Sequence, residues 1–205
     1  MSQLPLFASS GQVVLVDDSR GRIVYTPDIV SPEVARAWFG ELLGAVPWKA
    51  QRRRMYERDV DVPRLTAHFW LAPENDVPQA IRAATTTVVN LTGVPFNSVG
   101  LNFYRDGQDS VAPHTDHLHE IVAGFPIALL SLGDTRRMAI RAKEPPRRAF
   151  NVDLVAGSVF VMSYETQLHY THAIPKITTA VGPRISLAFR VKPTDDSTAP
   201  TSFYR

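Results

Sequence analysis

The second half of the chain consists of short β-type segments with no helix between them. From Val99 onward these runs read VGLNFY, IALLSL, RMAIRA, AFNVDL, SVFVMS and RISLAFRV, and clusters of Gly, Asp and Pro separate them. Punctuated runs of this kind are typical of strands joined by turns. A parallel α/β sheet needs helices between its strands, so the pattern excludes one. The sequence predicts an antiparallel sandwich or jelly roll whose closure leaves a central mouth for a ligand.

Two helices are predicted ahead of this β-rich part. In SPEVARAWFGELLG, Ser31 is placed to cap a helix, Pro32 to occupy its first turn and Gly44 to end it. The predicted buried stripe of this helix consists of Val34, Trp38 and Leu42. The second helix is predicted over residues 78–92, with a stripe of Ile81, Ala84, Val88 and Leu91. We therefore predict an α+β, mainly β domain with the N-terminal helices packed outside.

A chain of 205 residues fits one domain with a full core. We expect residues 12–192 to form this domain, with a flexible tail at 1–11 and a loose tail at 193–205. The chain contains no cysteine, which excludes disulfides and thiolate chemistry and favours the cytoplasm. It shows neither a secretory leader pattern nor an apolar run long enough to cross a bilayer. We expect a cytoplasmic monomer without a membrane partner.

The segment PHTDH places an imidazole and a carboxylate two residues apart, at His114 and Asp116. On a strand, that spacing sends both side chains to the same face, where they could bind one metal ion. His169 and His172 are the candidates for a third ligand. Two imidazoles and one carboxylate form the facial triad of non-haem Fe(II) oxygenases, which leaves positions open for cosubstrate and dioxygen. The alternative for the HxD pair is two exposed loop residues.

The segment PRISLAFR carries two arginines on one face of a predicted strand. Alternation places Arg184, Ser186, Ala188 and Arg190 on that face. Ile185, Leu187 and Phe189 then form a core face on the other side. A buried arginine needs an anionic partner. A dicarboxylate that chelates the metal would be such a partner, and ordinary ion pairs with carboxylates of the chain are the alternative.

Read together, VPRLTAHF, NFYRDGQDSVAPHTDH, FPIALLSLG, HYTHAIPK and PRISLAFR resemble the AlkB family of Fe(II)- and 2-oxoglutarate-dependent dioxygenases. The resemblance runs from about Tyr56 to Lys192, with the motifs in the family's order. It implies a double-stranded β-helix fold, with Fe(II), 2-oxoglutarate and O2 as metal and cosubstrates. The implied metal ligands are His114, Asp116 and His172, and His169 is then a supporting residue.

The same resemblance assigns residues to the cosubstrate. Asn102 and Tyr104 match the family's NxY pair that hydrogen-bonds 2-oxoglutarate, and Arg184 and Arg190 match its two carboxylate-binding arginines. The planar fork of arginine suits this task because it holds a carboxylate bidentately. Three positions depart from the family. Ser186 and Ala188 stand where Asn and Thr are frequent, and Leu118 follows the HxD where repair enzymes carry an acidic residue that helps recognise the base.

The implied activity is oxidative demethylation of N-alkylated bases, such as 1-methyladenine or 3-methylcytosine, in single- or double-stranded DNA or RNA. A flipped base would be held between side chains, for which His68, Phe69 and Trp70 are the candidates; core packing is the alternative for Phe69. Basic residues at 52–54 and 136–148 are expected to contact phosphates. Leu118 favours a second hypothesis, a related dioxygenase that acts on a protein side chain or small molecule. A non-catalytic nucleic-acid-binding module is the third.

The N-terminal segment QLPLF, from Gln3 to Phe7, resembles the short bacterial peptide that docks repair proteins onto the sliding clamp. Such peptides place an apolar pair in a groove of the partner, and an extended chain end suits them. The alternative is a terminus whose Leu and Phe pack onto their own domain. We keep the sliding clamp as a candidate partner.

Overall fold

The computed structural model describes residues 11–55 and 58–194, with the backbone alone for residues 51–55 and 58–61. The two predicted tails lie largely outside these ranges, and so does the candidate clamp peptide Gln3 to Phe7. None of the described helices is long and apolar enough to span a bilayer.

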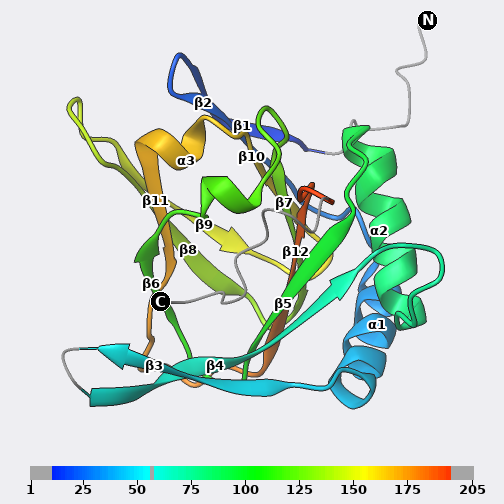
Figure 1. Ribbon diagram of the computed structural model, residues 1–205. Helices are drawn as coiled ribbons and strands as arrows, with labels where there is room; N and C mark the ends of the chain where they lie inside the picture. The colour runs from blue at the N-terminus through cyan, green and yellow to red at the C-terminus, as the bar shows by residue number, and fades with distance from the viewer. Residues whose placement is uncertain (1–10, 56–57, 195–205) are drawn as a thin grey trace, which may run out of the picture.

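The described strands form two antiparallel sheets that face one another (Figure 1). The larger is eight-stranded, in the order β1-β2-β10-β7-β12-β5-β4-β3. Its strands are β1 Val13–Asp18, β2 Gly21–Thr26, β3 Lys49–Met55, β4 Arg58–Trp70, β5 Ser98–Tyr104, β7 Ile127–Gly133, β10 Val159–Met162 and β12 Arg184–Arg190. The smaller is four-stranded, in the order β6-β11-β8-β9. Its strands are β6 Val111–His114, β8 Arg136–Ala142, β9 Ala149–Leu154 and β11 Tyr170–Ile174. The predicted double-stranded β-helix is confirmed.

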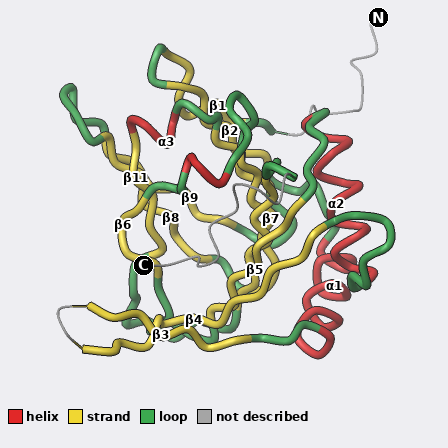
Figure 2. Tube along the Cα trace, viewed as in Figure 1, coloured by secondary structure: helices red, strands yellow, loops and turns green. Residues whose placement is uncertain are grey.

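The two longer helices lie side by side against the larger sheet, as Figure 2 shows in red. They are α1 Pro32–Ala45 and α2 Gln79–Thr92, and the short elements η1 Leu118–Glu120 and α3 Thr166–His169 lie in loops. Ser31 caps α1 as predicted, because its Oγ accepts a hydrogen bond from the Val34 N–H at 3.4 Å. Gly93, with φ of 71°, ends α2 in the left-handed conformation that favours glycine. Gly44, predicted to end α1, lies inside it, one residue before its last.

The buried faces of both helices differ slightly from the predicted stripes. Val34 is 41% exposed and Leu91 is 36% exposed, so neither belongs to the core. Ala35 and Ala80 are buried in their place. In both helices the buried face includes an alanine that the prediction left out, and its small side chain lets the helix backbone approach the sheet closely. Hydrophobicity alone favoured the larger residue.

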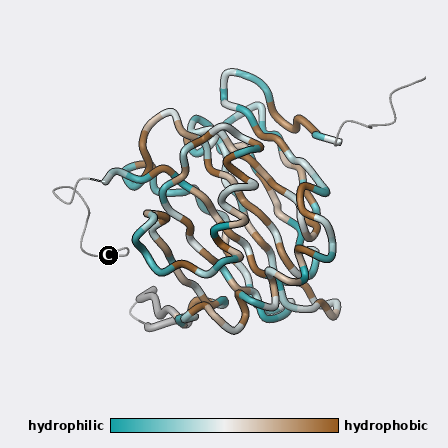
Figure 3. Tube along the Cα trace, turned by 90° about the vertical axis from the view of Figure 1, so that its right-hand side faces the viewer, coloured by the Kyte–Doolittle hydropathy of each residue, from teal (hydrophilic) through white to brown (hydrophobic). Residues whose placement is uncertain are grey.

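The core consists of two layers separated by the larger sheet. One layer fills the space between that sheet and the helices, and the other fills the space between the two sheets. Apolar stretches follow the central strands and polar stretches follow many of the turns (Figure 3). Strand β12 confirms the predicted alternation, because Ile185, Leu187 and Phe189 join the helix-side layer while Ala188 joins the layer between the sheets. The face of Arg184 and Arg190 is therefore the inner face of the sandwich.

Candidate active site

The structure brings together the three side chains implied as metal ligands. His114 ends β6, and His172 on β11 is its direct partner in the antiparallel ladder. Asp116 follows two residues after β6, and its Oδ1 lies 3.9 Å from His114 Nε2 and 4.0 Å from His172 Nε2. The ligand atoms of all three residues lie within 4.8 Å of one another. Two imidazoles and a carboxylate at this spacing can bind one ion on a shared face.

The site holds its ligands in the protonation states that a metal requires. Burial lowers the pKa of His172 to about 4, and repulsion from His114 adds to the effect. Burial also lowers the pKa of His114. At Asp116 burial acts in the opposite direction, but attraction by Arg190 and His172 outweighs it and lowers the pKa to about 2. At neutral pH the site therefore presents two neutral imidazoles and one ionised carboxylate, which are the metal-binding forms.

Hydrogen bonds orient these ligands without occupying their inward-facing atoms. His114 Nδ1 lies 3.0 Å from the Ala112 carbonyl oxygen, which leaves Nε2 for a metal. Arg190 donates from Nε and Nη2 to Asp116 Oδ2 at 3.0 and 2.6 Å, so Oδ1 remains towards the histidines. The Asp116 N–H donates to Gln167 Oε1 at 2.9 Å. Such outer contacts fix the orientation of metal ligands. The role of buried Gln167 on α3 has no visible signal in the sequence.

His169, the other sequence candidate for the third ligand, is not part of this cluster. It ends α3, and its carbonyl accepts a hydrogen bond from the Lys143 N–H at 2.9 Å. The strand that follows turns His172 inward instead. The structure thus favours His172, as the family resemblance implies.

Arg184 is a buried cation without a carboxylate partner among the described residues. It is 1% exposed, and its Nη2 donates to Ser131 Oγ at 3.0 Å. Its Nε and Nη1 have no hydrogen-bond partner. Unpaired buried N–H groups of a cation are costly, and an anion would remove that cost. The Arg184 site therefore fits one carboxylate of 2-oxoglutarate, whereas ordinary ion pairing accounts for the contact of Arg190 with Asp116.

The predicted NxY pair lies on β5, opposite the arginine strand. Tyr104 pairs with Arg184 and Asn102 pairs with Ser186 in the ladder, so the four side chains share the inner face. Asn102 Oδ1 accepts a hydrogen bond from Arg64 Nε at 2.7 Å, which orients the amide. Sequence reasoning missed Arg64, although it belongs to the VPR segment quoted above.

The three predicted substrate residues occupy both faces of β4. His68 pairs with Gly100 and Trp70 with Ser98, which places both on the face of Asn102. Their rings meet edge to face, with centroids 5.5 Å apart, and Trp70 is 42% exposed. Phe69 points to the other face and packs against the helix-side core. The structure therefore supports the packing alternative for Phe69, because neighbours on a strand alternate between faces.

Leu118 begins η1, two residues after Asp116 in the sequence, and its side chain is half-buried. The nearest following carboxylate, Glu120, accepts a hydrogen bond from Lys192 Nζ at 3.2 Å. Both side chains of that ion pair are largely buried, at 16% and 9% exposure. Leu118 therefore remains a departure from the family pattern, because the next carboxylate along the chain, Glu120, is already engaged by Lys192.

The basic residues predicted to contact phosphates divide into several groups. Arg136 is 1% exposed and cannot be a surface contact, and Arg137 pairs with Asp153 at 2.9 Å. The side chains of Arg52 to Arg54 lie outside the described residues. A hollow of about 320 Å³ at the β8–β9 turn is lined by Arg141, Lys143, Arg147 and Arg148. Of these, Arg148 pairs with Asp18 at 3.2 Å and Lys143 Nζ donates to the Gln167 carbonyl at 2.9 Å. The phosphate contact at this turn stays a prediction.

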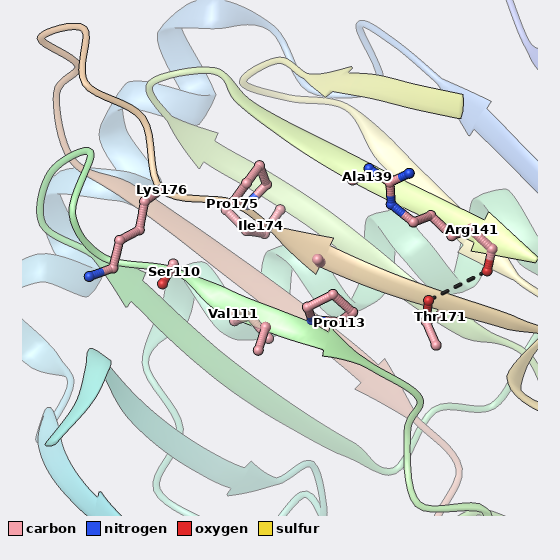
Figure 4. A pocket seen from close by; sticks show the side chains of 11 residues that line it. Ser110, Val111, Pro113, Ala139, Arg141, Thr171, Ile174, Pro175 and Lys176 are labelled. Atoms are coloured by element: carbon pink, nitrogen blue, oxygen red, sulfur yellow. Dashed lines mark hydrogen bonds between the residues drawn. The ribbon is translucent and has the colours of Figure 1, made fainter. Parts of the chain in front are cut away.

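A second hollow, of about 260 Å³, lies on the outer face of the smaller sheet (Figure 4). Its walls come from β6, β8 and β11, and Thr171 Oγ1 donates to the Arg141 carbonyl across it at 3.4 Å. Thr171 and Ala173 face this hollow, whereas His172 between them faces inward. The metal-ligand strands therefore present separate inner and outer surfaces.

Comparisons with known proteins agree with this geometry. Residues 22–190 match the family model described as the 2OG-Fe(II) oxygenase superfamily. The DNA oxidative demethylase ALKBH2 of Bos taurus is 34% identical over 127 residues, which cover 58% of this chain and 45% of the relative. The human alpha-ketoglutarate-dependent dioxygenase alkB homolog 3 is 28% identical over 197 residues, covering 87% of this chain and 69% of the relative. The chain spans about half the length of the ALKBH2 relatives that it matches. It belongs to the 2OG-Fe(II) oxygenase superfamily and, within it, to the AlkB family.

Proposed function

We propose that this chain is an Fe(II)- and 2-oxoglutarate-dependent dioxygenase that demethylates N-alkylated bases, such as 1-methyladenine and 3-methylcytosine, in nucleic acid. One observation carries the proposal. A His-Asp-His cluster and an unpaired buried arginine share the inner face of one sandwich. The first suits Fe(II) and the second suits a carboxylate. The names of the ALKBH2 relatives, DNA oxidative demethylases, support this choice of reaction.

His114, Asp116 and His172 would hold the metal. A facial set of three protein ligands leaves the remaining positions open for the 2-oxo acid and dioxygen. When bound, the iron supplies oxidation of a C–H bond, coupled to conversion of 2-oxoglutarate and O2 into succinate and CO2. On an N-methyl group the product of that oxidation releases formaldehyde and leaves an N–H.

The chain's own residues would bind and orient the cosubstrate. Arg184 would hold the distal carboxylate, with Tyr104 and Ser131 beside it. Asn102, oriented by Arg64, would contact the end nearer the metal. Arg190 lies closest to that end and already holds Asp116, so it would favour the adjacent carboxylate while keeping the metal ligand ionised. The surrounding apolar layer between the sheets would exclude water.

His68 and Trp70 are the substrate contacts that the geometry supports. Both lie on the inner face of β4, and the exposed indole of Trp70 offers a flat surface on which a flipped base could stack. The cations at the β8–β9 turn would contact phosphates.

Leu118 supports a second candidate function. A leucine cannot accept a hydrogen bond from the exocyclic amine of a base, and Glu120 is already paired with Lys192. A dioxygenase that modifies a protein side chain or small molecule would not need that acceptor.

One assay separates these functions and the non-catalytic alternative. The protein is supplied with Fe(II), 2-oxoglutarate, ascorbate and a methylated single-stranded oligonucleotide, and succinate and the methyl mark are measured. Succinate that forms only with the oligonucleotide, and that Asp116→Ala abolishes, supports demethylation. Slow succinate formation that ignores the oligonucleotide indicates the second function. Salt-sensitive binding of nucleic acid without metal binding or turnover would reject both.

The terminal segments lead to separate proposals that rest on the sequence alone. Gln3 to Phe7 would dock the enzyme on a bacterial sliding clamp, and deletion of these residues should remove clamp pull-down without changing activity on a free oligonucleotide. If the intact protein does not bind a clamp, this proposal is wrong. Limited proteolysis should trim residues 1–11 and 193–205 and leave a 12–192 core. We also propose a cytoplasmic monomer, which fractionation and sedimentation would test.

A further inference from the structure

Two buried arginines lie near one aromatic ring at the cosubstrate end of the sandwich. The guanidinium carbon of Arg184 lies 5.3 Å from the centroid of the Tyr104 ring, and that of Arg136 lies 5.6 Å from it. Both arginines are 1% exposed and Tyr104 is 3% exposed. Arg136 comes from β8 of the smaller sheet and Arg184 from β12 of the larger one. The two sheets thus each contribute one cation to the same interior region.

The partners of Arg136 are neutral. Its Nη1 donates to the Asp106 carbonyl oxygen at 2.9 Å, and its Nη2 donates to the carbonyl oxygens of Asp109 and Pro175 at 2.9 and 2.8 Å. The Asp109 carboxylate is engaged elsewhere, because it accepts three hydrogen bonds from Arg105. Within the described part of the chain, Arg136 therefore has no carboxylate in an ion pair. These bonds to carbonyls fix its position, and the Asp109 and Asp106 carboxylates offset part of its charge from a distance, because their attraction raises the pKa of Arg136 against the effect of burial.

This end of the sandwich therefore carries an excess of positive charge. Burial lowers the pKa of both arginines, the interaction with Tyr104 partly opposes this at each of them, and repulsion from Arg136 lowers the pKa of Arg184 further. Two like charges removed from water are costly unless an anion joins them. The unpartnered Nε and Nη1 of Arg184 show where that anion can be bound directly. Arg136 is held differently, because its Nη atoms already donate to carbonyls and only its Nε lacks a hydrogen-bond partner among the described residues.

We propose that Arg136 is a positioning residue that holds Tyr104 and supplies a second positive charge, so that this end of the site selects a 2-oxo acid with a distal carboxylate. The inference rests on the proposed function, in which Arg184 binds that carboxylate. Arg136 acts through space and through Tyr104, without touching the cosubstrate. A unit charge at a distance of about 10 Å in a protein interior changes the affinity for an opposite charge by roughly tenfold.

The competing explanation is that Arg136 only ties together the two loops that follow β5 and β11. The two explanations differ in how they treat a ligand without the distal carboxylate. Loss of a loop tie weakens binding of any 2-oxo acid, whereas loss of a charge weakens only binding of the dicarboxylate. The pair 2-oxoglutarate and 2-oxopentanoate makes this comparison, because both have five carbons and only the first has the second carboxylate.

The experiment measures binding of both acids by calorimetry to the full chain loaded with Mn(II), which binds without turnover. For Arg136→Met we expect the 2-oxoglutarate Kd to rise roughly tenfold or more, while that of 2-oxopentanoate stays within about twofold. Arg137→Met is the matched control, since Arg137 is the next residue, exposed and paired with Asp153. We expect both affinities to be unchanged in that variant.

Equal weakening of both acids by Arg136→Met, or no weakening of either, would overturn the inference. If that variant does not fold, Arg136→Gln carries the same comparison, because glutamine is neutral and keeps N–H donors for the carbonyls. Wild-type protein that binds Mn(II) but no 2-oxoglutarate would instead refute the proposed function. The two failures are therefore distinguishable.

Discussion

The arginines at the two ends of strand β12 differ in their ionic partners. Arg190 lies beside the metal ligands, and its Nη2 donates to Asp116 at 2.6 Å. Arg184 lies beside Tyr104 and has no carboxylate partner within the described residues. The metal end thus contains an anion that pairs directly with its arginine, whereas no carboxylate among the described residues pairs with Arg184 at the cosubstrate end. One end is electrostatically prepared for a cation, and the other is completed only when an anion binds.

Removal of the carboxylate at the metal end should have the largest effect. Asp116→Ala deletes the one anionic ligand and leaves Arg190 next to two imidazoles without its partner. We expect Mn(II) affinity to fall by at least about 100-fold and turnover to be lost. A Mn(II) titration followed by fluorescence or calorimetry, with succinate as the second readout, checks this. Unchanged Mn(II) affinity would show that the cluster is not the metal site.

Removal of the cation at the cosubstrate end should affect binding without harming the ligand-free fold. Arg184→Met deletes a buried charge that lacks an ion-pair partner, so we expect ligand-free stability to stay equal or rise by about 1 kcal/mol. We expect the 2-oxoglutarate Kd to rise about 100-fold. Thermal unfolding with and without 2-oxoglutarate measures both quantities. A large loss of ligand-free stability would mean that Arg184 is mainly a structural residue.

The metal end should also make the ligand-free protein sensitive to acid. The pKa of His172 is lowered to about 4 from its usual 6.5, so the unfolded chain takes up this proton before the folded one does. The stability from a neutral buried His172 is therefore present above 6.5 and is lost as pH falls from 6.5 towards 4. Between about pH 7 and about pH 5 we expect a loss of about 2 kcal/mol from this residue. Urea unfolding at both pH values checks it, and a His172→Gln variant should lose correspondingly less.

Substitution of the exposed Trp70 should affect substrate binding but neither metal binding nor cosubstrate binding. Trp70 is 42% exposed and lies on β4, so Trp70→Ala should change the free energy of unfolding by less than about 0.5 kcal/mol. Affinities for Mn(II) and 2-oxoglutarate should not change. The Kd for a methylated oligonucleotide should rise about tenfold, the magnitude of one lost base–aromatic stack. Fluorescence anisotropy measures this, and an unchanged Kd would remove Trp70 from the substrate contacts.

Local patterns in the sequence predicted much of the fold and of the candidate site. The strand runs after Val99, the helix cap at Ser31 and the alternation of β12 all agree with the structure. Each depends on the two- or 3.6-residue period of a single element. The sequence analysis predicts no strand over residues 58–70, so it groups Phe69 with His68 and Trp70. Had β4 been identified, alternation would have assigned Phe69 to the opposite face.

Contacts between distant segments could not be predicted in this way. Arg136 belongs to a run of basic residues that suggests a surface, yet its guanidinium lies between loops that follow β5 and β11. Gln167 and Arg64 likewise acquire their roles only through partners far along the chain. Charge in a sequence indicates a cost of burial, but it does not show whether other segments offset that cost.

By itself the sequence determined which residue types alternate along each strand, and hence that His114, Asp116 and the two arginines of β12 could share inner faces. The family resemblance carried by the sequence also selected His172 over His169. Only the tertiary structure decided that the ligand atoms of the three residues lie within 4.8 Å of one another, that Asp116 pairs with Arg190, and that Arg184 has no carboxylate partner among the described residues. Side-chain alternation is a property of one strand, whereas strand pairing and burial depend on contacts between residues far apart in the chain.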